Sequence, residues 1–106
     1  MNDSTQRRFN VAVVGATGAV GEAMLSILAE RDFPVARLVP LASEHSAGTM
    51  VRFADDEYFV QDLAAFDPTG IDIALFSAGG EVSRQYAPKF AAAGAAVIDN
   101  SSAFRY

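Results

Sequence analysis

Short apolar runs alternate with segments of helical period along most of the chain. Residues Phe9–Val14 are apolar and rich in β-branched side chains, and the run ends at Gly15. This is the pattern of a buried parallel strand. From Gly18 the spacing predicts a helix that ends before Pro34, because proline cannot continue it. The expected buried stripe of this helix consists of Val20, Ala23, Met24, Ile27 and Leu28.

The rest of the chain continues the alternation. Residues 50–60 are expected to form one or two short strands around a turn at Asp55–Glu57, and Asp67–Gly70 is a second turn signal. A helix is expected over Val82–Ala91, and Pro88 is expected to kink it or divide it in two. Apolar runs predict further strands at Val35–Leu41, Ile71–Phe76 and Ala95–Ile98.

This alternation indicates an α/β fold, a Rossmann-like, doubly wound and mainly parallel sheet over residues 9–106. Residues Met1–Arg8 are polar and are expected to form a flexible arm. Ligands of such sheets bind beyond the carboxyl ends of the strands. The polar, glycine- or serine-rich segments that follow strands should therefore gather on one rim. These are GATGAVG (15–21), ASEHSAG (42–48), SAGG (77–80) and DNSS (99–102).

Composition narrows the class of protein. The chain has 106 residues, which suits one domain, and 51% of them are hydrophobic. Its net charge of −5 gives no electrostatic reason to expect nucleic acid or an anionic membrane as partner. There is no cysteine, which excludes disulfides, thiolate metal sites and a cysteine nucleophile within these residues, and His45 is the lone histidine. Because no signal peptide or long apolar stretch is visible, we expect a cytoplasmic protein.

The loop from Gly15 to Gly21 follows a predicted strand and opens a predicted helix, which is the context of a dinucleotide-binding fingerprint. Gly15 would permit the tight turn, Gly18 would let the backbone approach a pyrophosphate, and Gly21 would let helix and strand pack closely. The first N–H groups of the helix would point at the anion. The alternative interpretation is a tight turn that binds nothing.

The loop after the second strand bears on the choice between NAD and NADP. An NAD site usually carries an acid about 20 residues after the glycine loop, but the second strand ends at Leu41-Ala42 without one. Ser43, His45 and Ser46 suit a 2′-phosphate, which favours NADP. Glu44 and the lack of an arginine count against it, and an ordinary solvated loop remains the alternative.

The other rim segments offer weaker signals. Ser77, Ala78 and Gly79 form a small, permissive turn that a ligand could approach closely. Asn100 and its neighbours supply donors and acceptors, and Arg105 is a cation suited to phosphate or carboxylate. The alternative interpretations are an ordinary turn at residues 77–79, a helix cap or turn at Asn100, and a solvated surface charge at Arg105. Aromatic residues are interpreted as core or half-buried: Tyr58, Phe66, Tyr86 and Phe90.

Together these segments resemble the N-terminal portion of the aspartate-semialdehyde dehydrogenase family. The resemblance rests on GATGAVG after VAVV, LASEHSAG, DIALFSAGGEVSRQYAP and AGAAVIDNSSAFR, and it covers nearly all of the chain from Phe9 to Tyr106. Where the family often has an arginine, this chain has His45. The resemblance implies that Arg105 binds the phosphate of the substrate. It implies that NADP is bound by Gly15, Thr17, Gly18, Ala19, Val20, Gly21, Ser43, His45, Ser46, Ser77, Ala78, Gly79 and Asn100.

The implied reaction makes aspartate semialdehyde from aspartyl phosphate with NADPH and releases phosphate, on the route to lysine, threonine and methionine. Family members use a cysteine nucleophile and a histidine acid/base. Both are expected to lie beyond this chain, which should be inert alone, and the full-length protein is expected to be a dimer or tetramer. The alternatives are N-acetyl-glutamyl-phosphate reductase, a non-catalytic paralogue of the dehydrogenase, and a stand-alone nucleotide-binding module.

Overall fold

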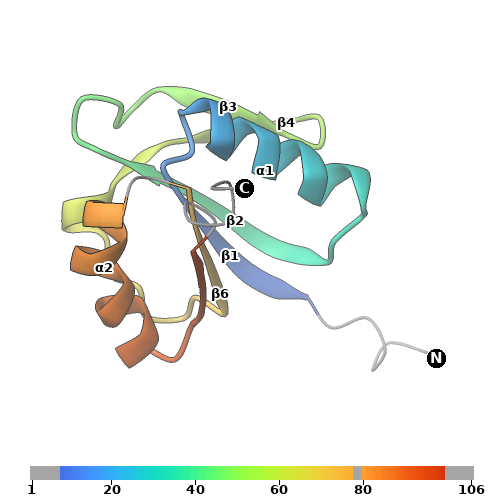
Figure 1. Cartoon of the computed structure of the whole chain (residues 1–106). Helices are drawn as coiled ribbons and strands as arrows, with labels where there is room; N and C mark the ends of the chain where they lie inside the picture. Colours follow the sequence, from blue (N-terminus) through green and yellow to red (C-terminus); the bar gives the residue numbers. More distant parts are fainter. Residues whose placement is uncertain (1–7, 78–79, 100–106) are drawn as a thin grey trace.

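A parallel sheet of five strands forms the centre of the molecule (Figure 1). The computed structural model describes residues 8–77 and 80–99. Residues 1–7 of the arm predicted at Met1–Arg8 lie outside the described residues, as do the predicted site residues Ala78, Gly79, Asn100 and Arg105. The elements, in chain order, are β1 (Phe9–Val14), α1 (Ala19–Glu30), β2 (Val35–Ala42), β3 (Met50–Phe53), β4 (Asp56–Phe59), β5 (Gln61–Asp62), the short 3₁₀ helix η2 (Leu63–Ala65), β6 (Ile73–Phe76), α2 (Gly80–Ala92) and β7 (Ala96–Asp99).

The strand order β5-β2-β1-β6-β7 confirms the doubly wound α/β fold. Every neighbouring pair in this sheet is parallel. From the central strand β1 the chain builds outward through β2 to β5, and then crosses back to build β6 and β7 on the other side. The order therefore reverses between β1 and β6, and the crevice beyond these two strands is where such sheets bind ligands.

Two apolar cores cover the two faces of the sheet. Because side chains alternate along a strand, Ala12 and Val14 face one core and Val11 and Val13 face the other, and all four are fully buried. The core of Ala12 and Val14 includes Phe90 of α2. The opposite core includes α1 and residues of the β3–β4 hairpin. Figure 1 shows this arrangement, with α1 and the hairpin together above the sheet and α2 on its other side.

The predicted buried stripe of α1 is confirmed at Val20, Met24 and Leu28, which lie in or against the core of Val11 and Val13, and is wrong at Ala23 and Ile27. The buried residues are Gly21, Met24 and Leu25, whereas Ala23 is exposed and Ile27 is 50% exposed. Gly21 packs against the backbone of Gly15 and Ala16 in the preceding loop. A count of apolar side chains passes over a glycine, so the sequence pattern does not show this contact.

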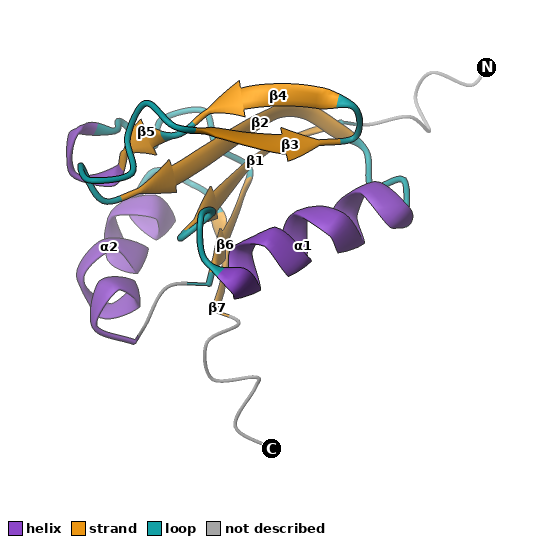
Figure 2. Cartoon of the chain, turned by 90° about the horizontal axis from the view of Figure 1, so that it is seen from above, coloured by secondary structure: helices purple, strands orange, loops and turns teal. Residues whose placement is uncertain are grey.

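Smaller differences concern turns and short elements. The hairpin turn is at Ala54-Asp55, both with positive φ, so the predicted turn at Asp55–Glu57 is displaced toward the N-terminus. The two-residue β5 and the 3₁₀ helix η2 were not expected. Helix α2 runs through Pro88 without division. Seen from above in Figure 2, α1 and α2 are each one continuous helix. No helix in the described ranges has the length and apolar character that a membrane span needs.

Candidate functional site

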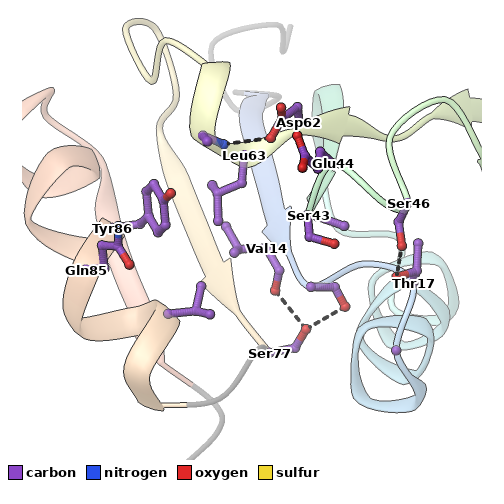
Figure 3. Close-up of a pocket in the computed structure, with 15 residues that line it drawn as sticks. Val14, Thr17, Ser43, Glu44, Ser46, Asp62, Leu63, Ser77, Gln85 and Tyr86 are labelled. Carbon is purple, nitrogen blue, oxygen red and sulfur yellow. Dashed lines mark hydrogen bonds between the residues drawn. The ribbon is translucent and has the colours of Figure 1, made fainter.

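A pocket of about 700 Å³ lies beyond the carboxyl ends of β1, β2, β5 and β6. This is the rim that the strand order marks as the ligand crevice, and the volume is in the usual range for a cofactor site. The close-up in Figure 3 draws its side chains. The lining residues are Val14, Gly15, Thr17, Gly18, Ala42, Ser43, Glu44, Ser46, Asp62, Leu63, Ala64, Ser77, Val82, Gln85 and Tyr86.

The glycine loop is held tightly against the end of β2. The backbone N–H groups of Gly15 and Ala16 donate to the carbonyl oxygen of Leu41, at 2.7 and 3.2 Å. The N–H of Gly18 donates to the carbonyl oxygen of Gly15 at 3.2 Å and closes the turn. Gly15 has a φ of 88°, a conformation that favours glycine. The tight turn predicted at Gly15 is therefore present.

Gly18 and Gly21 are glycines for different reasons. A Cβ on Gly21 would overlap the carbonyl oxygen of Gly15 and come 2.8 Å from the Cα of Ala16. The close contact expected at Gly21 is therefore present, although it is with the loop directly after β1 and not with the strand itself. A Cβ on Gly18 would meet only the carbonyl oxygen of Gly15, at 3.7 Å, which is ordinary contact. The fold itself does not require glycine at position 18, and Gly18 lines the pocket.

Helix α1 begins at this pocket with open hydrogen-bond donors. Gly18 is its N-cap and provides no side-chain cap. The first backbone bond of the helix runs from the N–H of Glu22 to the carbonyl oxygen of Gly18. The N–H groups of the first turn, at Ala19, Val20 and Gly21, precede that bond and have no acceptor inside the helix. Ala19, Val20 and Gly21, which were predicted to bind the cofactor, are not among the residues that line the pocket.

Ser77, the first residue after β6, joins two strand ends at the pocket. Its hydroxyl lies 2.8 Å from the carbonyl oxygen of Val14 and 3.0 Å from that of Gly15. Figure 3 shows these contacts as dashed lines at the base of the pocket. The hydroxyl holds the glycine loop to β6, at the point where the strand order reverses.

The loop after β2 forms one side of the pocket. Ser43 and Ser46 line it, as their predicted role requires, but His45 is exposed and is not among the lining residues. The hydroxyl of Thr17 donates to that of Ser46 at 3.5 Å, a weak bond that bridges the glycine loop and this loop (Figure 3).

Sequence reasoning missed several lining residues. Helix α2 contributes Val82, Gln85 and Tyr86, whose spacing places them on one helical face. Tyr86 is half-buried, as expected, but it also forms the pocket wall. Asp62 and its neighbours were missed because β5 has only two residues, too few to show a strand period.

The chemistry of the lining suits binding. Its polar side-chain groups are hydroxyls, an amide and the carboxylates of Glu44 and Asp62. Within residues 8–77 and 80–99, no cluster of three or more histidine, aspartate or glutamate residues could hold a metal. Val14, Leu63 and Val82 supply apolar side chains to the lining. A large pocket with one apolar wall and few polar groups is typical of a cofactor site.

Comparison with known proteins gives one consistent answer. Residues 10–106 match a family model described as the NAD-binding domain of semialdehyde dehydrogenases. The chain is 60% identical over 100 residues to an aspartate-semialdehyde dehydrogenase of Legionella pneumophila, covering 94% of this chain and 29% of that protein. The crystal structure of aspartate-semialdehyde dehydrogenase II from Vibrio cholerae, in complex with ASA, superposes with a TM-score of 0.88 at 56% identity, covering 94% of this chain and 33% of that one.

A more distant structure shares the fold. The aspartate-semialdehyde dehydrogenase of Candida albicans, solved with NADP, has a TM-score of 0.69 at 21% identity and covers 93% of this chain. The chain spans about a third of the length of the proteins it matches, from 29% to 33%.

Proposed function

Because the chain belongs to the family of semialdehyde dehydrogenase NAD-binding domains, we propose that it is the NADP-binding part of an aspartate-semialdehyde dehydrogenase. The proposed reaction is the NADPH-dependent reductive dephosphorylation of L-aspartyl 4-phosphate to L-aspartate 4-semialdehyde. It serves the biosynthesis of lysine, threonine and methionine. The identity of 60% to the Legionella pneumophila enzyme supports this choice of reaction.

The observation that carries the proposal is Gly18. It lines the pocket at the open N-terminus of α1, and nothing in the fold itself requires a glycine there. A pyrophosphate held by the first N–H groups of α1 does require it, since the phosphate oxygens must come close to the backbone. Gly15 provides the turn and Ser77 fixes the loop to β6, and these contacts shape the proposed cradle.

The remaining parts of the cofactor would occupy the rest of the pocket. We assign the 2′-phosphate to Ser43 and Ser46, which line the side formed by the loop after β2, with His45 from the same loop. The nicotinamide, which supplies the hydride when NADPH is bound, would extend toward Ser77, Ala78 and Gly79. A structure solved with NADP on the same fold, at 21% identity, is compatible with this assignment.

The substrate and the chemical step depend on further groups. Arg105 is assigned to the phosphate of the substrate, and Asn100 to the cofactor side of the same segment. These 106 residues contain no cysteine, so the proposed acyl-enzyme chemistry requires a nucleophile that they do not supply. The whole enzyme is proposed to be a cytoplasmic homodimer or tetramer. The Vibrio cholerae structure in complex with ASA supports aspartate semialdehyde as substrate.

The test is an assay of the protein encoded by the complete gene. We expect phosphate-dependent formation of NADPH from aspartate semialdehyde and NADP, followed by absorbance, and no turnover with N-acetyl-glutamate semialdehyde. Nucleotide binding without turnover of either aldehyde would instead identify a non-catalytic paralogue or a binding module. Absence of both binding and turnover would contradict the proposal.

A further inference from the structure

Among the described residues that line the pocket, two carboxylates and no cation lie at its β2 end. Glu44 and Asp62 both line it, and no lysine, arginine or histidine occurs among the described lining residues. Strand register places Asp62 beside Ala42, two positions before Glu44. Figure 3 draws both carboxyl groups on the same side of the pocket, close to the end of β5.

One oxygen of the Asp62 carboxylate has a structural role. Asp62 is the N-cap of η2, and its Oδ1 accepts a hydrogen bond from the N–H of Ala64 at 3.0 Å. Its negative charge is not needed for that bond, because asparagine caps equally well. Within the described ranges Asp62 forms no ion pair.

Glu44 has no comparable structural role. Its side chain is exposed and makes no hydrogen bond or ion pair with any described residue. Packing therefore gives no reason for a carboxylate at this position. The residue follows Gly21 by 23 positions and comes just after the second strand of the nucleotide-binding unit. In NAD-binding sheets this is the place of the acid that accepts hydrogen bonds from the ribose hydroxyls.

We propose that Glu44, with Asp62 beside it, weakens recognition of the 2′-phosphate, so that this pocket accepts NAD as well as NADP. The inference rests on the proposed function, since it concerns the nucleotide assigned to the same pocket. A carboxylate can accept a hydrogen bond from a ribose 2′-hydroxyl. It repels a phosphate monoester, which carries about −1.5 to −2 charges at neutral pH. The hydroxyls of Ser43 and Ser46 can form hydrogen bonds with either a 2′-hydroxyl or a 2′-phosphate. They therefore do not favour NADP over NAD.

The proposal is tested by calorimetric titration of NADP and NAD into the protein encoded by the complete gene. For the unmodified protein we expect the two Kd values to differ by less than about tenfold. Glu44→Gln should tighten NADP about three- to tenfold at low salt, as expected for removal of one charge near a dianion, and should leave NAD equal or weaker. The gain should shrink as salt is added.

Two further variants distinguish the effect of a charge at the pocket from the effect of the overall charge of the protein. Asp62→Asn keeps the cap of η2 and should tighten NADP by a smaller factor in the same direction. Glu30→Gln removes an equal charge from the far end of α1, about 16 Å along the helix from its first residue, and should change neither Kd.

The outcomes distinguish this inference from the proposed function. Binding of NADP more than about a hundredfold tighter than NAD, unchanged by Glu44→Gln, would overturn the inference and leave the nucleotide site intact. If neither dinucleotide bound to a folded protein, both would be overturned. A loss of NADP affinity in Glu44→Gln would also contradict the inference, because the carboxylate would then be assisting that ligand.

Discussion

The hydroxyl of Ser77 donates to the carbonyl oxygen of Val14 at 2.8 Å, across 63 residues of sequence. The backbone N–H of Ser77 donates to the same oxygen at 2.9 Å. The hydroxyl is also 3.0 Å from the carbonyl oxygen of Gly15, where the glycine loop begins. One side chain therefore holds the end of β6 against the loop that is proposed to carry the pyrophosphate.

Ser77→Ala should cost stability modestly and weaken nucleotide binding. Neither carbonyl becomes an orphan, because Val14 keeps the Ser77 N–H and Gly15 keeps the Gly18 N–H. We therefore expect a loss of only about 0.5–1.5 kcal/mol in the free energy of unfolding, measured with denaturant. Nucleotide affinity should fall several-fold, because the loop would be less rigidly placed.

Ser26→Ala is the matched control for this substitution. Ser26 is exposed on α1, and its removal should change the free energy of unfolding by no more than about 0.5 kcal/mol and leave nucleotide affinity unchanged. Equal effects of the two substitutions would mean that the Ser77 hydroxyl does not position the loop.

Gly21→Ala should strongly destabilise the protein. The added Cβ would overlap the carbonyl oxygen of Gly15 and crowd the backbone of Ala16, and neither is a flexible group that can move aside. Overpacking of this kind costs about 1–3 kcal/mol, and backbone obstruction places this site at the upper end. The melting temperature of the variant, measured by thermal unfolding, tests this prediction. An unchanged melting temperature would show that helix and loop can separate without cost.

Much of the fold was predictable because a buried parallel strand is visible in the sequence as a short, continuous apolar run. Four apolar runs gave β1, β2, β6 and β7, and the glycine loop lay between a strand and a helix as its spacing indicated. The parallel sheet was predictable from this alternation, since parallel strands need crossover connections.

Features that depend on packing were not predictable in the same way. The close contact of α1 with the preceding loop is made by Gly21, which has no side chain to count in an apolar stripe. Tyr86 and Asp62 reach the pocket only because α2 and β5 are placed beside β1 and β2 by the sheet. Each resembles an ordinary core or surface residue in the sequence, since only the tertiary fold brings it to the site.

Asp67 should contribute to the pH dependence of stability. The N–H of Thr69, at 3.0 Å, and then its hydroxyl, at 2.7 Å, donate to the Asp67 carboxylate and hold its pKa below the ordinary value of 3.8. A depressed pKa in the folded state gives stability above the ordinary pKa, and this stability is lost as pH falls through the folded pKa. The contribution is therefore complete at neutral pH and disappears in strong acid.

Thr69→Val tests this assignment, because it removes the hydroxyl donor and keeps the N–H donor. The pKa of Asp67, followed by NMR titration, should rise part of the way toward 3.8. Denaturation at a series of pH values should show the variant less stable than the original protein above pH 3.8, with the difference shrinking in more acidic solution. A difference that stayed constant through acidic pH would contradict the role of this carboxylate.

Gly18→Ala should leave the fold intact and damage nucleotide binding, the opposite of the result expected at Gly21. The new Cβ has only one neighbour, 3.7 Å away, and the φ of −82° is open to alanine. We therefore expect a loss of stability below about 1 kcal/mol, the usual difference between glycine and alanine at an N-cap. Because the methyl group would stand where the pyrophosphate approaches the start of α1, affinity for NADP should fall about tenfold or more, and further in Gly18→Val. Calorimetric titration beside thermal unfolding separates the two effects. Unchanged affinity in a folded Gly18→Val protein would remove the pyrophosphate from this loop, and with it the main support for a nucleotide in the pocket.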